Sequence, residues 1–478
     1  MSDRRRLCLP CDDREHWANV VALAASPIDG LEELQKRMSV YCQLRGVGGL
    51  SRALKDSGHQ LFWQSTLPSI IQRALELPTL HAQHAARGEP LWVMQENAMA
   101  RQEIPRDLGV SLLANMFLCT FDKAFDALRC EVDMPEPSFV MLLANGASTE
   151  VAKLRMFIHF FERVAQSPPQ GRIIINRVVG TALDADAWLQ SSQPLLPLEV
   201  APERVGFETA PGLAHADFAN QYIGGGVLVG GCVQEEIRFS ICPELCLSML
   251  VCPCMQVEEA IQIIGAEQFS NYEGYMFSLR FGGDFVDETA RWPDGTVQSA
   301  VLAMDALDLR WQDDSLCAQM SQGCLLRELN KSAAAFAPVD SESLAHFPIV
   351  ATGNWGCGAF GGFAPLKALV QWASASQCGR RLRYFPFEQS FGPWLRDLSD
   401  ASVQAGVTVG NLLTMLSRLR PAPMRFELKL PTGDGESSPL REQAEGDEVE
   451  KSADLNRYPF RLLELVSTAL LDNETPSK

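Results

Sequence analysis

The sequence predicts an α/β protein in which a mixed sheet flanked by helices follows a mainly α-helical accessory domain. Three observations lead to this fold class. Apolar residues recur at helical spacing early in the chain, and short β-branched runs alternate with helical stretches from about residue 172. The length of 478 residues suffices for two or three domains of ~100–200 residues. We expect a helical domain at 1–195, a sheet domain at 196–418 and a C-terminal extension at 419–478.

The expected helices of the N-terminal region are marked by apolar residues spaced three and four positions apart, which share one helix face. Three such stripes are Leu67, Ile70, Ile71, Ala74 and Leu75; Leu112, Leu113, Met116 and Phe117; and Leu154, Phe157, Ile158, Phe161 and Val164. No compact chemical motif accompanies them, so we assign this region an accessory role.

Strand candidates in the second region are short and rich in β-branched or aromatic residues. They are Arg172–Val179, Ala260–Gly265, Tyr275–Phe281, Val301–Ala306, Ile349–Thr352 and Arg383–Phe387. Helical stretches are expected after Gln234, before Lys331 and from Pro365 to Ser376. Strands that alternate with helices are typical of a layered α/β domain.

The C-terminal extension differs in composition from the rest. Residues 430–455 are rich in Gly, Ser, Pro, Asp and Glu, and we expect an acidic mobile loop there because such a segment buries little apolar surface. The apolar run Tyr458–Val466 predicts a short docking helix.

Charge and composition exclude several function classes. The net charge is −18 and the pI is about 4.9, whereas a protein that binds DNA or RNA nonspecifically carries a basic face. No apolar run approaches the ~20 residues that span a bilayer. We therefore expect no direct DNA binding and no membrane segment. A polyanionic ligand would have to be recognised locally, by backbone amides and helix N-termini.

The 14 cysteines predict reduced thiols, because no secretory signal is recognisable. Two spacings also fit a zinc site: Cys8-x-x-Cys11, and the set Cys242, Cys246, Cys252 and Cys254. Neither has a histidine pair nearby, so we favour buried thiols over a metal site.

Residues 224–239, GGGVLVGGCVQEEIRF, form the first candidate site. Five glycines fall within eight residues, and Glu235 and Glu236 begin the helical pattern that follows. A glycine inside a regular element costs roughly 0.5–1 kcal/mol relative to alanine, so this cluster indicates that a ligand contacts the main chain. We expect Pro243 to break the helix. The alternative is a solvated helix N-terminus that merely favours acids.

The two carboxylates are not expected to be equivalent. Neighbouring residues on a helix point about 100° apart, so we expect one to donate a proton and the other to position the ligand. The helix dipole favours the ionised form. A working acid therefore also needs burial or a nearby negative charge to raise its pKa.

The second candidate site is 351–362, ATGNWGCGAFGG, in which Gly356, Gly358 and Gly361 match GxGxxG between a strand and a helix. The motif fits a loop that cradles phosphates at a helix N-terminus. A nucleotide-dependent oxidoreductase is a further hypothesis that rests on this motif alone.

Aromatic residues at the ends of predicted strands form the third candidate. Tyr272, Tyr275 and Phe277 follow one strand, and Phe385 and Phe387 end another. Such side chains can hold an adenine, although core packing must explain most of them. Together the three candidates suit an adenine diphosphate that carries a glycosidic bond to be cleaved.

The pattern GGG, seven residues, QEE resembles the signature of the poly(ADP-ribose) glycohydrolase family. Further segments are similar to that family: DFAN at 217–220, NYEGY at 271–275, ATGNWGCGAFGG at 351–362, RYFPF at 383–387, and in the helical region LPSIIQRALELP at 67–78 and SLLANMFLCTF at 111–121. The similarity covers roughly residues 10–415, with a weaker match at YPF, 458–460.

The resemblance implies a macrodomain-like sheet domain that hydrolyses ribose–ribose O-glycosidic bonds of poly(ADP-ribose) and releases mainly ADP-ribose. It implies that Glu236 protonates the leaving ribose oxygen and then activates water, while Glu235 holds the ribose hydroxyls. We expect no cofactor and no metal. The substrates would be poly(ADP-ribose) and poly(ADP-ribosyl)ated proteins, and we expect a monomer that acts in the DNA damage response, in the nucleus and/or cytoplasm.

The resemblance also assigns substrate contacts. A diphosphate cradle would be formed by Gly224, Gly225, Gly226 and the loop Gly356–Phe360, which contains Gly358, with Asn354 and Phe360 near the diphosphate. Tyr275 would close over the ligand and Phe387 would stack on the adenine. Gln234 and Glu208 would read the adenine edge. Asp217 and Asn220 would fix the ribose next to the scissile bond. The family often has an acid where this chain has Phe363, so the resemblance does not assign the contacts at the far side of the diphosphate.

A non-catalytic ADP-ribose reader on the same fold is the alternative from another functional class. A reader has no need of two adjacent glutamates, so their retention favours the enzyme.

Overall fold

A computed structural model describes residues 5–55, 59–202, 206–210, 212–311, 315–387 and 390–418. The expected acidic loop and docking helix lie outside these residues. The chain forms two compact units, each made of discontinuous segments. The first comprises Met1–Thr181, Glu208–Ala306 and Ala337–Pro348; the second comprises Ala182–Phe207, Leu307–Phe336 and Ile349–Lys478.

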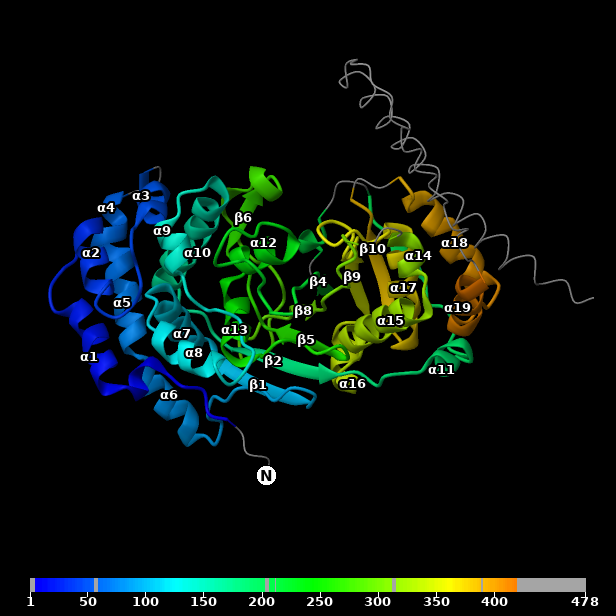
Figure 1. Ribbon diagram of the computed structural model, residues 1–478, viewed down its shortest axis with the longest axis horizontal. Coiled ribbons are helices and arrows are strands. Elements are labelled where there is room, and N and C mark those ends of the chain that lie inside the picture. Colours follow the sequence, from blue (N-terminus) through cyan, green and yellow to red (C-terminus); the bar gives the residue numbers. More distant parts are fainter. Residues whose placement is uncertain are drawn as a thin grey trace, which may run out of the picture. The chain divides into compact units, whose positions relative to one another are not determined.

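The first unit begins with helices, as predicted, drawn in blue to cyan in Figure 1. Helix α5 (Leu67–Leu75) has a proline in its first turn and buries four apolar residues at helical spacing: Leu67, Ile70, Ile71 and Ala74. The other N-terminal helices are α1 (Arg14–Val21), α2 (Leu31–Met38), α3 (Gly48–Lys55), α4 (His59–Leu61), α6 (Leu77–Ala86), α7 (Arg106–Phe117), α8 (Asp122–Arg129) and α9 (Val140–Ala144).

Helix α10 (Ser148–Gln166) connects this helical part with the candidate site. Its predicted stripe is buried, and the helix contacts both α3 and α12 (Gln234–Ile241), the helix that carries the two glutamates. The stripe joins a continuous apolar core that extends into the sheet of the same unit, where Ile261, Ile263 and Val301 belong to it.

The sheet of the first unit has the order β1 (Ala100–Pro105), β2 (Arg172–Val179), β5 (Glu259–Ile264), β8 (Ala300–Ala303), β4 (Ala214–Asp217). The first three pairings are antiparallel, whereas β4 runs parallel to β8, so the sheet is mixed. Asp217 is the last residue of β4, which places a predicted site residue at the end of a buried strand. The shorter helices α13 (Ser248–Val251) and α16 (Ser341–His346) also belong to this unit.

Three strand predictions are confirmed in this unit, and one is wrong in part. Strands β2, β5 and β8 match their predicted ranges within a few residues. The predicted strand Tyr275–Phe281 instead begins with a short turn, Met276–Ser278, between β6 (Ser270–Glu273) and β7 (Arg280–Asp284). Gly274 and Met276 have positive φ angles, and the Ser278 hydroxyl bonds to both the N–H and the C=O of Tyr275, so the chain turns here.

The second unit contains three parallel strands in the order β9 (Ile349–Gly353), β10 (Arg381–Phe385), β3 (Leu198–Val200). Helix α17 (Ala364–Gln377) joins β9 to β10, as the alternation predicted, and packs against α15 (Gln322–Phe336). The remaining helices are α11 (Ala185–Leu189), α14 (Ser315–Gln319), α18 (Gly392–Gln404) and α19 (Val409–Arg418).

The domain boundaries given above stay a prediction. Strands β1 and β2 lie inside the range expected to be helical, and the compact units do not follow a single cut along the chain. Within the described residues no single helix is long and apolar enough to cross a bilayer; α7 and α8 meet that test only as a pair bent by 89°.

Candidate active site

The two adjacent glutamates lie at the start of helix α12, as predicted, and each is held by its own pair of backbone amides. Glu235 accepts hydrogen bonds from the N–H groups of Asn220 (2.8 Å) and Gly224 (2.7 Å). Glu236 accepts from Gly226 N–H and from Val233 N–H, both at 2.9 Å. Both side chains are buried, so these charge-assisted bonds fix two carboxylates in different orientations.

The glycine loop that precedes α12 closes tightly around these carboxylates. A Cβ atom on Gly225, whose φ is +49°, would lie 2.6 Å from Glu235 Oε2 and 2.7 Å from Glu236 Oε1. A Cβ on Gly231 would lie 2.6 Å from Glu236 Oε1. The glycines were predicted to cradle a diphosphate. What they demonstrably permit is the close approach of backbone to both glutamates.

Asp217 completes a buried acidic cluster. Its carboxylate is fully buried, and neither oxygen has a hydrogen-bond partner among the described residues. Burial raises the pKa of Asp217 to about 8; the Arg238 guanidinium opposes this shift, and the charges of Glu236 and Glu208 add to it. Asp217 is therefore largely protonated at neutral pH and can donate as well as accept a hydrogen bond.

The neighbouring carboxyl groups respond to the same environment. Burial raises the pKa of Glu235 well above its ordinary value, reinforced by Asp217 and Glu236 and opposed by the two amides that it accepts. Burial also raises the pKa of Glu208. At Glu235, burial and adjacent charge, the conditions that the sequence set for an acid at this helix start, are both present.

Gln234 and Asn220 bind the chain around the cluster. The Gln234 side chain accepts from Phe218 N–H (2.8 Å), and its amide donates to the Ala216 carbonyl (3.4 Å), so it ties α12 to the end of β4. The Asn220 side chain accepts from Tyr222 N–H (3.0 Å). These contacts support the site, and the predicted contacts with adenine and ribose stay predictions.

Tyr275 lies beside the cluster at the tip of the β6–β7 hairpin. Burial raises the pKa of its phenol to about 12, and the charges of Glu236 and then Glu208 contribute. The residue is nonetheless 42 % exposed, and the neighbouring Phe277 is 81 % exposed. The hairpin thus presents aromatic side chains to solvent close to the carboxylates.

Four predicted site residues belong to the second unit. Asn354 accepts from the Tyr384 hydroxyl (2.8 Å) and donates to the Pro386 carbonyl (3.0 Å), so its side chain clamps the end of β10. A Cβ on Gly358 would meet no atom within 4 Å. The Arg310 guanidinium lies 5.6 Å from the centre of the Phe360 ring. Phe387 is 45 % exposed and has a φ of +58°, an uncommon conformation for this residue type.

Two buried basic residues close to the glutamates and the glycine loop, Arg238 and Lys153, were not predicted as site residues. Arg238 follows Glu236 on α12, and its Nε and Nη1 atoms have no hydrogen-bond partner in the described part of the chain. Lys153 lies on α10 and donates to three carbonyls of the glycine loop. A basic residue on the apolar face of each predicted helix was the available signal: Lys153 precedes Phe157 by four positions, and Arg238 precedes Ile241 by three.

Of the cysteines considered for zinc, Cys8 is exposed and Cys11 is half-buried, whereas the second set consists of thiols in the core. Cys242, Cys246, Cys252 and Cys254 are buried, and all fourteen cysteines of the chain are free. A different group, Cys42, Cys119 and Asp122 in the helical part, brings its sulfur and oxygen atoms within 4.8 Å of one another. Burial raises the pKa of the Cys119 thiol, which favours the neutral form.

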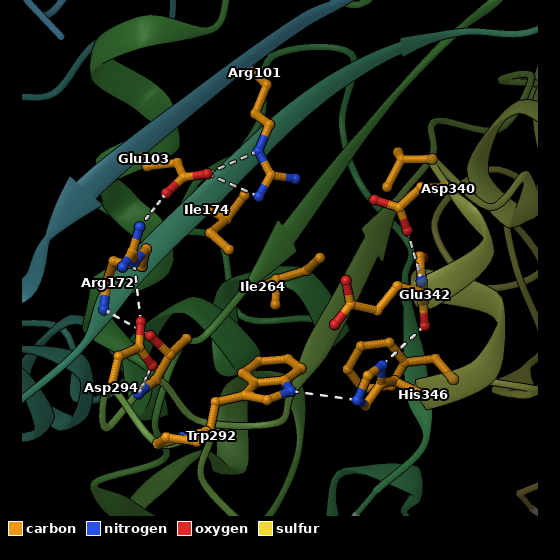
Figure 2. Close-up of a pocket in the computed structure, with 15 residues that line it drawn as sticks. Arg101, Glu103, Arg172, Ile174, Ile264, Trp292, Asp294, Asp340, Glu342 and His346 are labelled. Carbon is orange, nitrogen blue, oxygen red and sulfur yellow. Dashed lines mark hydrogen bonds and ion pairs between the residues drawn. The ribbon is translucent and has the colours of Figure 1, made fainter. Parts of the chain in front are cut away.

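The first unit also contains a separate cavity of about 380 Å³, whose charged groups are poorly suited to binding a diphosphate (Figure 2). Arg101 and Arg172 both pair with Glu103, and Arg172 also pairs with Asp294. The positive charges of the two guanidinium groups that line the cavity are therefore already neutralised. None of the predicted site residues lines this cavity.

Comparisons with known proteins agree with the geometry. The model of the helical domain of poly(ADP-ribose) glycohydrolase matches residues 54–177, and the model of its macro domain fold matches residues 185–391. These matches confirm the predicted fold class, a macrodomain-like mixed α/β sheet preceded by a helical domain.

Individual relatives carry the same description. Poly(ADP-ribose) glycohydrolase 1 of Arabidopsis thaliana is 29% identical over 432 residues, which cover 74% of this chain and 77% of the relative. Poly(ADP-ribose) glycohydrolase 1 of Caenorhabditis elegans is 32% identical over 330 residues, which cover 66% of this chain and 40% of the relative. A solved structure of poly(ADP-ribose) glycohydrolase from Deinococcus radiodurans in complex with ADP-ribose is 13% identical, with a TM-score of 0.26, and covers 47% of this chain and 92% of its own.

Proposed function

Since the chain belongs to the poly(ADP-ribose) glycohydrolase family, we propose that it hydrolyses ribose–ribose O-glycosidic bonds of poly(ADP-ribose) and releases mainly ADP-ribose. The observation that carries this proposal is the pair of buried glutamates, each held by two loop amides, next to the buried Asp217, whose pKa is raised by burial. A binding protein needs one complementary surface, whereas this arrangement supplies separate carboxyl groups for positioning and for proton transfer.

Glu236 acts as the general acid and base. In the first step its carboxyl group protonates the leaving ribose oxygen while the glycosidic C–O bond breaks and positive charge develops on the other sugar. The resulting carboxylate then takes a proton from water as the water oxygen bonds to the anomeric carbon. Both steps need the carboxyl group in one fixed place, and the amides of Gly226 and Val233 supply it.

Glu235 and Asp217 hold the sugar. Glu235 has one amide bond on each oxygen, which leaves further lone pairs for ribose hydroxyl groups. The buried oxygens of Asp217 lack a partner among the described residues, and a hydroxyl of the substrate would satisfy them. Within the first unit, Gly224–Gly226 would contact the diphosphate and Tyr275 would lie over the ligand. The roles that the resemblance implies for Asn354, Gly358, Phe360 and Phe387 stay predictions.

Release of ADP-ribose from purified polymer by the Glu236→Gln variant tests the proposal. We expect turnover to be abolished while ADP-ribose, measured by titration calorimetry, still binds, because the amide keeps the shape and loses the transferable proton. Glu199→Gln, an exposed acid on β3, should behave as wild type. If Glu236→Gln turned over polymer near the wild-type rate, Glu236 would not be the general acid. Binding of ADP-ribose without any release by the wild type would favour the reader.

We further propose that the substrates include poly(ADP-ribosyl)ated proteins and that the protein acts as a monomer in the DNA damage response, in the nucleus and/or cytoplasm. The net charge of −18 supports action on the polymer without direct DNA binding, and fourteen free thiols support a reducing compartment. Imaging of the tagged full chain before and after DNA damage, with sedimentation of the purified protein, tests these points.

A further inference from the structure

Lys153 places a buried positive charge from the helical domain against the glycine loop. Its side chain is fully buried on α10. The ammonium group donates to the carbonyls of Gly226 (3.1 Å), Val229 (2.6 Å) and Gly231 (2.5 Å). A lysine is almost never buried to this extent without partners that compensate for the loss of water. These three carbonyls therefore form a built site for one ammonium group.

The same loop residues hold the proposed acid. The Gly226 N–H donates to Glu236 Oε1, and the Gly226 carbonyl accepts from Lys153, so one residue joins the two side chains. The Gly226 carbonyl also accepts from Val229 N–H (3.1 Å) and Gly231 N–H (3.0 Å), which folds the loop back on itself. A displacement of the loop would therefore move the amide that fixes Glu236.

The chemistry of the site favours lysine specifically. An ammonium group has three donors and no acceptor, which matches three converging carbonyls. A neutral amine would turn a lone pair toward one carbonyl, and an apolar side chain would leave the carbonyls that it replaces unpaired, at a cost of about 1–3 kcal/mol for each buried group. The guanidinium of arginine is planar, so it reaches the same carbonyls with different geometry.

We propose that Lys153 is a positioning residue for catalysis, through which the helical domain holds the glycine loop so that Gly226 presents its amide to Glu236. This inference rests on the proposed function, because it explains how the general acid is kept in place. It gives the helical domain a defined part in the reaction without direct contact with substrate.

The charged state of Lys153 gives a second consequence. The groups that face it are Glu236 on α12, Cys232 before that helix, Glu150 on α10 and Cys246 beyond α12. Burial lowers the pKa of Lys153 to about 8, although the carboxylates oppose this shift. The anchor is therefore complete below about pH 8 and loses a donor above it.

The first experiment compares Lys153→Met with wild type and with Lys123→Met, a lysine exposed on α8. We expect kcat on polymer to fall about 100-fold in Lys153→Met, because a shift of about 1 Å at a catalytic group costs this much. KM should change less than about threefold, since the substrate contacts stay. Lys123→Met should match wild type. A folded Lys153→Met variant whose kcat equals that of wild type overturns the inference. The proposed function is judged separately, because it stands as long as the wild-type protein itself releases ADP-ribose from polymer.

The second experiment does not depend on the fold of the methionine variant. Hydrogen exchange of wild type should show amides 224–232 exchanging faster above about pH 8 than base-catalysed exchange alone predicts, and kcat should decline over the same interval. Lys153→Arg stays charged, so it should lose this excess exchange. Its kcat should decline less above about pH 8 than that of wild type, because only the loss of the Asp217 proton is then common to both proteins. Identical pH profiles for exchange and kcat in both proteins overturn the inference.

Discussion

The chemistry of the site depends on which buried carboxyl group keeps a proton. An aspartate in an unfolded chain has a pKa of about 3.9. Burial raises the pKa of Asp217 to about 8 in the folded protein. Between these values the folded protein holds a proton that the unfolded chain releases. Keeping Asp217 protonated in the folded protein, the state that suits catalysis, therefore lowers the free energy of unfolding in this pH range.

This proton predicts a pH dependence with a defined sign. Because the unfolded state binds fewer protons between about pH 4 and pH 8, stability falls as pH rises, by up to about 1.4 kcal/mol per pH unit for one proton. We expect the Tm of wild type to fall more steeply over this interval than that of Asp217→Asn, measured by calorimetry. Asp397→Asn, on the surface, should follow wild type. Parallel curves for wild type and Asp217→Asn would contradict the shift.

The position of the two glutamates at a helix start was predictable because local sequence carries that information. Glu235 and Glu236 stand out because two acids follow a glycine cluster at a helix start, and their unequal partners follow from helix geometry. Lys153 could not be assigned in this way, because its three acceptors are backbone carbonyls of a segment far along the chain. A lysine on the apolar face of a predicted helix indicates that its ammonium group needs a buried acceptor, but the sequence does not show which acceptor that is.

At the scale of elements, the glycine loop is a rigid support rather than a flexible one. Its conformation is set by internal hydrogen bonds, by Lys153 and by contact with two carboxylates. Gly225 and Gly231 are needed here because the carboxylate oxygens of Glu235 and Glu236 approach too closely for a Cβ atom.

Gly225→Ala tests this view of the loop. We expect ADP-ribose release to fall about 100-fold or more, because the new methyl group would push aside the carboxylates of Glu235 and Glu236. Gly88→Ala is the matched control, since Gly88 also has a positive φ but has open space around its Cβ position. It should lose some Tm and no activity, measured in the same release assay. Equal activity losses in both variants would point to backbone strain instead.

Strands were predictable where their composition was distinctive. The β-branched run of β2 gave its ends directly, whereas β1, with the sequence ARQEIP, has no such pattern because it lies at the edge of the sheet and is partly exposed. Strands β3 and β4 have three and four residues, too few to show a period of two. Tyr275–Phe281 has strand-like composition, but local turn chemistry prevailed.

At the scale of the whole molecule, the net charge of −18 decides how a polyanion can bind. A wide positive field is absent, so affinity must come from amides and a few close side chains. Composition alone could establish this. It could not establish the two compact units, because each is assembled from segments that are distant in the sequence.

The salt dependence of ADP-ribose affinity tests this prediction about the whole molecule. We expect the logarithm of ADP-ribose affinity to fall with the logarithm of salt concentration with a slope of magnitude below about 2, since proteins lose about 0.9 per phosphate that they neutralise with basic side chains. Calorimetry between about 50 and 200 mM salt provides the slope, over the range in which DNA binders weaken strongly. A slope as steep as that of a protein with many phosphate contacts would contradict recognition by a local cradle.

The anchoring of the glycine loop by α10 limits how far this protein can be shortened. A fragment that begins at residue 185 would keep both glutamates, Asp217 and the whole glycine loop, and would lack the lysine that holds the loop. Inactivity of such a fragment would say nothing about the glutamates. An inhibitor screen on it would sample a loop shape that the intact enzyme does not present, so ligand discovery should start from a protein that includes α10.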